Sequence, residues 1–166
     1  MKISKTSQIL TALFSLACAI AAGYLILRGS GMFPEPSISL ILLTAIFIIL
    51  LSCSRKSFYF ILLPLVCLHV IYTPTGLNFG APSYQYIASV LATDMLETKE
   101  FLLQIPVSSY LAALAIPVLV FLHYKSAVKF GVKFYRNKTF IALATLLIGY
   151  NLPIAAPLKE TIDSSV

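Results

Sequence analysis

Long apolar runs alternate with short polar segments along the whole chain. Five such runs occur, and their interiors contain almost no charged residues. An apolar run of about 20 residues can cross the hydrocarbon core of a membrane as an α-helix. The pattern therefore predicts five membrane-spanning helices, over about residues 8–27, 37–54, 57–72, 105–122 and 139–156.

The composition agrees with this pattern. Of the 166 residues, 59% are hydrophobic and 11% are charged, and the mean hydropathy is +0.93. A soluble globular domain carries about 25% charged residues. The predicted fold is therefore an all-α, polytopic membrane bundle of five transmembrane helices, with no room beside it for a large soluble domain.

The segments between the runs contain turn and loop residues. Glycine and proline cluster over residues 29–36, which predicts a loop. A longer loop is predicted over residues 73–104, and residues 83–103 within it have the spacing of a short amphipathic helix. Residues 1–158 then form the transmembrane domain, and residues 159–166 form a short polar tail.

The basic residues predict the orientation of the chain. With a cytoplasmic N-terminus and five crossings, nine lysines and arginines fall in the cytoplasm and three fall on the outer side. This bias is typical of the positive-inside rule. It explains the net charge of +6 without a nucleic-acid partner and predicts a C-terminus on the outer side. The nine cytoplasmic residues are Lys2, Lys5, Arg55, Lys56, Lys125, Lys129, Lys133, Arg136 and Lys138; the other three are Arg28, Lys99 and Lys159.

The stretch Thr93–Leu102 is the most unusual part of the chain. It contains Asp94, Glu97 and Glu100, which are three of the six carboxylates. Such a cluster cannot lie in hydrocarbon, so it marks a segment that faces water on the outer side. Residues three apart on a helix are neighbours, so Asp94 and Glu97 share one face. These side chains are either a ligand site or simply the solvated face of an interfacial helix.

Other chemistry finds little support in the sequence. No Cys/His cluster has the spacing of metal ligands, and no predicted span has a charged residue at its centre. A proton or ion pathway usually requires such a residue. We therefore expect no catalytic residue, no metal site and no cofactor within this chain, and we regard a small transporter as the least favoured function.

Three segments resemble the membrane domain of bacterial phosphoethanolamine transferases. These enzymes modify lipid A or the lipopolysaccharide core, and they include the mobile colistin-resistance type. The resemblance rests on Asn78-Phe79-Gly80 and on the stretch Tyr86–Leu102, where Thr93-Asp94-Met95-Leu96-Glu97-Thr98 is similar to the family's loop motif. The tail from Gly149 to Asp163 is similar to the region after the family's fifth helix.

The resemblance implies a function that this chain cannot complete alone. The family's catalysis belongs to a periplasmic, sulfatase-like domain with zinc and a threonine nucleophile, which takes phosphoethanolamine from phosphatidylethanolamine. No Gly-Glu-Thr or Gly-Glu-Ser motif is present here. We therefore interpret the chain as a fragment or truncated form that lies in the bacterial inner membrane, presents phosphatidylethanolamine to a catalytic domain, and is inactive alone. A non-catalytic membrane scaffold is the alternative.

The resemblance also suggests which residues contact the lipid head group. Glu97 matches the glutamate of the family's loop motif, and Thr93, Asp94 and Thr98 match its neighbours. Ser89 stands where some family members have an asparagine, and we include it as a candidate. The predicted head-group site therefore consists of Ser89, Thr93, Asp94, Glu97 and Thr98.

Overall fold

The structure, a computed structural model, describes residues 5–33, 35–82, 94–130 and 138–151. All regular structure in these ranges is helical, which confirms the predicted all-α class. A continuous run over Arg55–Phe79 is made of α3, the π-helical turn η1 and α4. In chain order the elements are α1 (Lys5–Gly29), α2 (Ile38–Ser52), α3 (Arg55–Ser57), η1 (Phe58–Leu62), α4 (Leu63–Phe79), α6 (Met95–Gln104), α7 (Val107–Phe130) and α8 (Lys138–Asn151).

Three of these helical runs are long and apolar enough to cross a membrane. They are Thr6–Gly29, Arg55–Phe79 and Val107–Ala127. The helices α2 and α8 are also apolar, but they have 15 and 14 residues. At 1.5 Å per residue such helices extend about 22 Å, which is less than the roughly 30 Å of a hydrocarbon core. The structure supports a helical membrane protein, and the number of five spans stays a prediction.

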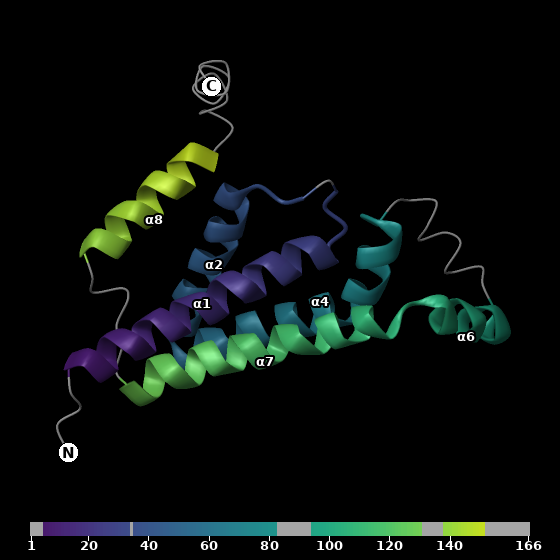
Figure 1. The fold of residues 1–166 in the computed structure, drawn as a ribbon, viewed down its shortest axis with the longest axis horizontal. Coiled ribbons are helices and arrows are strands. Elements are labelled where there is room, and N and C mark those ends of the chain that lie inside the picture. Colours follow the sequence, from purple (N-terminus) through teal and green to yellow (C-terminus); the bar gives the residue numbers. More distant parts are fainter. Residues whose placement is uncertain (1–4, 34, 83–93, 131–137, 152–166) are drawn as a thin grey trace.

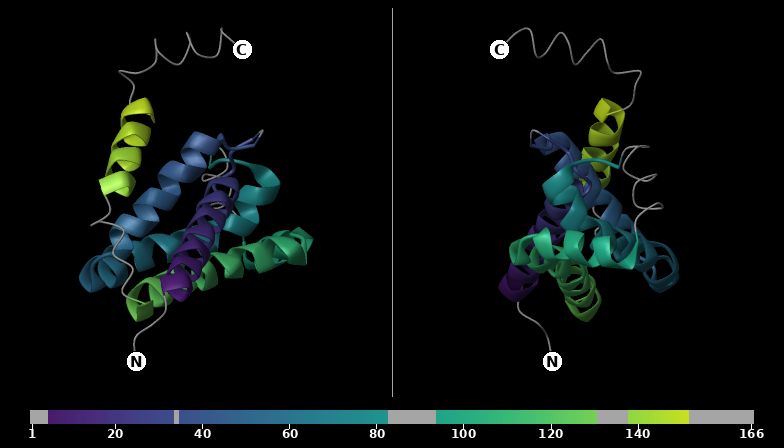
Figure 2. Two further views of the ribbon diagram at one scale, coloured as in Figure 1. Left: turned by 60° about the vertical axis from the view of Figure 1, so that its left-hand side comes forward. Right: turned by 90° about the vertical axis from the view of Figure 1, so that its right-hand side faces the viewer.

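The helices α1, α4 and α7 lie against one another and form the centre of the bundle (Figure 1). Ala19 and Ala22 of α1 are completely buried, as is Ile116 of α7. Small residues at such positions let helix backbones approach closely, and close packing drives helix association in membranes. Figure 2 shows α2 beside α1, with α8 on the α2 side and away from the central three helices.

The outer surface of the central helices is apolar. Phe60 and Ile71 of the α3–α4 run are 80% and 76% exposed. Such side chains would be unfavourable in water, but in a bilayer they face lipid tails at no cost. The surface therefore agrees with the class that the hydropathy predicts.

The structure corrects the predicted start of the loop after the third apolar run. The prediction of a loop from residue 73 is wrong, because α4 continues through Pro74 to Phe79. Thr73, Pro74 and Gly76 are buried, and Thr73 donates a hydrogen bond to the carbonyl of His69 at 2.6 Å. Packing against the end of α1 thus overrides the turn-forming residues. Figure 1 shows the last part of α4 bending away from its first part, as a proline inside a helix favours.

The fourth predicted span also ends too early. We expected residues 123–138 to form a polar loop, but α7 extends to Phe130. His123 is buried against α1, where its Nδ1 lies 2.9 Å from the backbone oxygen of Ser15. The hydroxyl of Ser15 in turn lies 3.3 Å from the carbonyl of His123. A histidine with polar partners on a facing helix can remain inside the bundle, so the helix does not end there.

A π-helical turn interrupts the third span near its start. The N–H of Leu63 donates to the carbonyl of Phe58, five residues back. Pro64 follows directly and has no N–H to continue the ordinary α-helical pattern. The widened turn thus lies just before Pro64, which cannot donate a backbone hydrogen bond. Such π-turns occur frequently at functional sites.

Candidate functional site

The acidic stretch lies on α6, and its first carboxylate begins that helix. Asp94 is the N-cap, and its Oδ1 accepts hydrogen bonds from the N–H groups of Leu96 and Glu97, both at 2.8 Å. The capping satisfies two backbone donors that would otherwise have no partner within the helix. One oxygen of Asp94 is therefore occupied by a structural role, which the head-group prediction did not foresee.

Glu97 and Thr98 occupy the first turn of α6 and are exposed. Glu97 lies in the first turn of the helix, near the positive end of the helix dipole. The hydroxyl of Thr98 donates a hydrogen bond to the carbonyl of Asp94 at 2.8 Å, so it also helps to form the helix start. Of Asp94, Glu97 and Thr98, Glu97 is the one whose side chain takes no part in these capping bonds.

A shallow pocket of about 420 Å³ lies between α6 and the start of α7. Its wall is mostly apolar and includes one lysine. Glu97 does not belong to this wall. The lining residues are Met95, Thr98, Lys99, Leu102, Leu103 and Tyr110.

Two contacts hold α6 against the bundle. The ring of Phe101 packs against Phe79 at the end of α4, with 5.0 Å between the ring centroids. The hydroxyl of Tyr110 in α7 donates to the carbonyl of Leu102 at 2.8 Å. None of the residues of α6 is buried. The helix is thus held at the edge of the bundle with most of its surface free.

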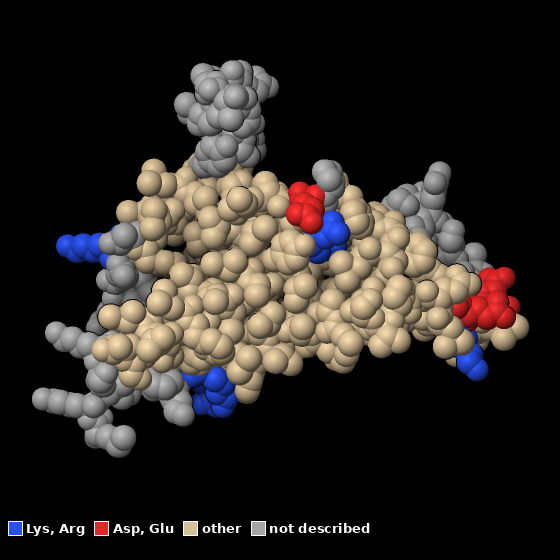
Figure 3. Space-filling view, viewed as in Figure 1, with Lys and Arg blue, Asp and Glu red and all other residues tan. Residues whose placement is uncertain are grey.

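Several of the described cations lie at the end of the molecule opposite the carboxylates of α6. Figure 3 shows the acidic side chains of α6 at one end, far from the end at which α1 begins. Arg55 and Lys56 begin the third span, and Lys125 lies near the end of α7, so these cations share the opposite end. We call this the basic end and the other the α6 end.

The structure tests the predicted site only in part. It brings Asp94, Glu97 and Thr98 together in the first turn of α6. Ser89 and Thr93 lie outside the residues that the structure describes. Within the described ranges, no three histidine, cysteine, aspartate or glutamate side chains are grouped so that they could hold a metal ion.

The sequence analysis did not identify Lys99 as a residue that lines this pocket. Met95 and Leu102 line the pocket, and Lys99 lies four residues after Met95 and three before Leu102. That spacing brings all three to one face of a helix. The helical register therefore contained the signal that Lys99, and not Glu97, faces the pocket.

These features define a class: a helical membrane protein whose described residues include three helices long and apolar enough to cross a membrane and an exposed acidic helix at one end. Over 162 residues the chain is 75% identical to a Haemophilus influenzae protein named "Putative phosphoethanolamine transferase". The match covers 98% of this chain and 33% of that relative, so the chain spans about a third of its length. The identity confirms the resemblance given by the loop motif. No family profile and no solved structure matches the chain.

Proposed function

We propose that the chain forms the membrane part of a phosphoethanolamine transferase and presents an aminophospholipid to a catalytic domain on the outer side of the bacterial inner membrane. The observation that carries this proposal is the 75% identity over 98% of the chain. The apolar spans supply the membrane attachment. The acceptor is lipid A or the lipopolysaccharide core, as in the family that the loop motif resembles.

Within this proposal Glu97 contacts the head group of the lipid. Its carboxylate is exposed on a helix that lies at the edge of the bundle, where a lipid ammonium group can reach it. An exposed ion pair contributes only about 0–1 kcal/mol. A larger effect requires that a second domain covers the pair and excludes water.

A chimera tests both parts of the proposal. This chain replaces the matching third of the Haemophilus influenzae relative, and mass spectrometry of lipopolysaccharide measures the addition of phosphoethanolamine in cells. We expect the chimera to modify lipopolysaccharide as the unaltered relative does. An inactive chimera beside an active relative would contradict the proposed role of the chain.

The same chimera tests Glu97 with a matched control. Glu97→Gln should lower the modification by up to about 5-fold, or more if the site closes over the pair. Glu100→Gln removes a carboxylate from the same exposed helix and should leave the modification unchanged. If both variants modify lipopolysaccharide like the parent chimera, the head-group role of Glu97 is wrong, whereas the role of the chain stands.

A further inference from the structure

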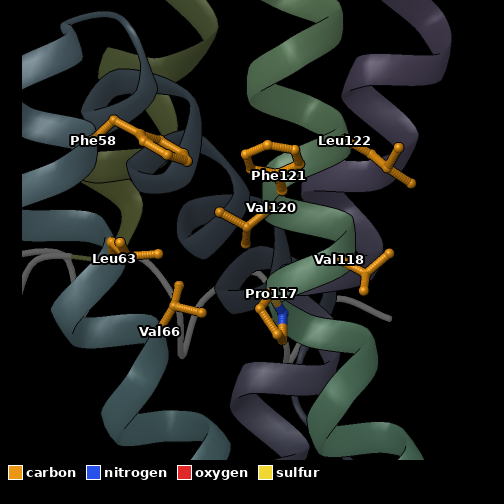
Figure 4. Close-up of a pocket in the computed structure, with 8 residues that line it drawn as sticks. All are labelled: Phe58, Leu63, Val66, Pro117, Val118, Val120, Phe121 and Leu122. Atoms are coloured by element: carbon orange, nitrogen blue, oxygen red, sulfur yellow. The ribbon is translucent and has the colours of Figure 1, made fainter.

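A second, wholly apolar groove lies between the third span and α7, toward the basic end. Its volume is about 350 Å³, which falls within the range of small-molecule sites. Figure 4 shows Phe58, Leu63 and Val66 on one side, pointing toward α7, with Phe121 and Pro117 on the other. Leu63 and Phe121 are 38% and 46% exposed, so the groove opens to the outer surface of the bundle.

The groove exists because both of its walls are irregular helices. The π-turn over Phe58–Leu62 widens one wall immediately before Pro64. Pro117 lies inside α7 and removes a backbone hydrogen bond from the other wall. Regular helices pack by fitting ridges into grooves, and two such interruptions at the same level prevent this fit. In a membrane, the space that remains suits a hydrocarbon chain.

Lys125 and Arg55 lie beside the part of the groove that is nearest the basic end of the molecule. The Nζ of Lys125 lies 5.1 Å from the ring centroid of Phe121, which lines the groove. The guanidinium carbon of Arg55 lies 5.9 Å from the ring centroid of Tyr59. Tyr59 packs edge-on against Phe58, another lining residue, at 5.2 Å. Lys125 therefore contacts the apolar lining directly, and Arg55 reaches it through the ring of Tyr59.

Stacked rings join these two cations across the helix interface. Tyr124, the neighbour of Lys125, stacks on Phe58 with 3.8 Å between the ring centroids. It also meets Tyr59 edge-on at 6.2 Å. Amphipathic aromatic rings of this kind gather at membrane–water interfaces. These rings thus lie at the level of the membrane–water interface, between the apolar groove on one side and the two cations on the other.

We propose that this groove and the two cations Arg55 and Lys125 form a binding site for an anionic glycerophospholipid. One acyl chain lies in the groove, and the phosphate lies between the guanidinium and ammonium groups. Basic pockets between transmembrane helices bind anionic head groups in this way. The carboxylates of the described residues lie in α6 and at Glu35, which follows α1, so none of them stands at this end to receive the ammonium of a zwitterionic lipid. This site is separate from Glu97 and does not depend on the proposed function.

Native mass spectrometry of the purified chain, released from nanodiscs of equal phosphatidylglycerol and phosphatidylethanolamine, tests the site. The double variant Arg55→Gln/Lys125→Gln should retain phosphatidylglycerol about 30-fold more weakly, at about 5-fold for each lost charge. Lys99→Gln removes an exposed cation at the α6 end and serves as the matched control. It should leave the retention of phosphatidylglycerol unchanged.

A second variant tests the groove itself and keeps every charge. Leu63→Trp fills the groove from a position that points toward α7 (Figure 4) and is 38% exposed, so the fold should tolerate it. It should release phosphatidylglycerol and leave bulk phosphatidylethanolamine unchanged. Equal loss in the double variant and in Lys99→Gln would mean an unspecific anionic lipid shell, and it would overturn the proposal. Full retention in either the double variant or Leu63→Trp would overturn it as well.

Discussion

The backbones of α1 and α4 touch near the α6 end, where a glycine occupies each side of the contact. A Cβ atom added at Gly76 would collide with the backbone carbonyl of Gly29. A Cβ at Gly29 would in turn collide with the side chain of Thr73. Backbone atoms cannot move aside like the end of a flexible side chain, so this crossing requires the absence of a side chain at Gly76.

Replacing Gly76 with alanine should therefore destabilise the bundle. Overpacking of this kind costs about 1–3 kcal/mol of unfolding free energy. The matched control is Gly149→Ala in α8, where an added Cβ would have no atom within 4 Å. That change should be neutral or stabilise by up to about 1 kcal/mol, because alanine favours helix more than glycine does.

Thermal unfolding in detergent, followed by circular dichroism at 222 nm, compares these two variants with the parent chain. The midpoint should fall for Gly76→Ala and stay or rise for Gly149→Ala. If the two alanine variants unfold at the same temperature, the close contact of α1 and α4 is not present in the folded protein.

At the scale of the element, α6 depends on its cap. No residue of α6 is buried, so packing contributes little to the helix, and a ten-residue helix is marginal in water. Loss of an N-cap side chain costs about 1 kcal/mol. Asp94→Ala should therefore speed amide hydrogen exchange at Leu96 and Glu97 by about 5-fold, measured in nanodiscs by mass spectrometry.

The variant Asp94→Asn distinguishes the effect of the N-cap hydrogen bonds from the effect of the negative charge. Asn is as good an N-cap as Asp, so Asp94→Asn should keep the exchange protection of the first turn while it removes the carboxylate. If Asp94→Ala exchanges as slowly as the parent chain, other contacts hold α6, of which Phe79–Phe101 is the strongest candidate. The pair of variants also shows whether any effect of position 94 on lipid binding arises from structure or from charge.

The apolar runs predicted the helices, but not all of their ends. Hydropathy is a local property, so it located the centres of the long spans correctly. The ends of α4 and α7 depend on contacts between distant segments, such as Thr73 against Gly29 and His123 against Ser15. Pro74 and the basic residues after His123 favour a loop when they are considered alone. Only the partner helix shows why the chain remains helical there.

The same limit applies to the two candidate sites. The cap at Asp94 and the position of Lys99 follow from helical spacing, so the sequence contained them. The groove near Phe58 does not follow from any local pattern. It requires a π-turn in one span and Pro117 in another to meet at the same level.

At the scale of the molecule, the charges predict the orientation. Arg55, Lys56 and Lys125 lie at the basic end, and the carboxylates of α6 lie at the opposite end. The positive-inside rule then places the basic end in the cytoplasm. With this orientation, α2 must cross the bilayer although it has only 15 residues. Glu35 before α2 and Cys53 after it then lie on opposite sides of the membrane.

Cysteine labelling in intact cells tests this orientation together with the crossing of α2. Cys53 is exposed at the end of α2, and Glu35→Cys introduces a thiol before the helix. A membrane-impermeant maleimide should label Glu35→Cys in intact cells, whereas Cys53 should react only after the cells are permeabilised. Labelling of both positions from outside would mean that α2 does not cross. Labelling of Cys53 alone would invert the orientation and place the acidic α6, with its candidate lipid contact at Glu97, in the cytoplasm.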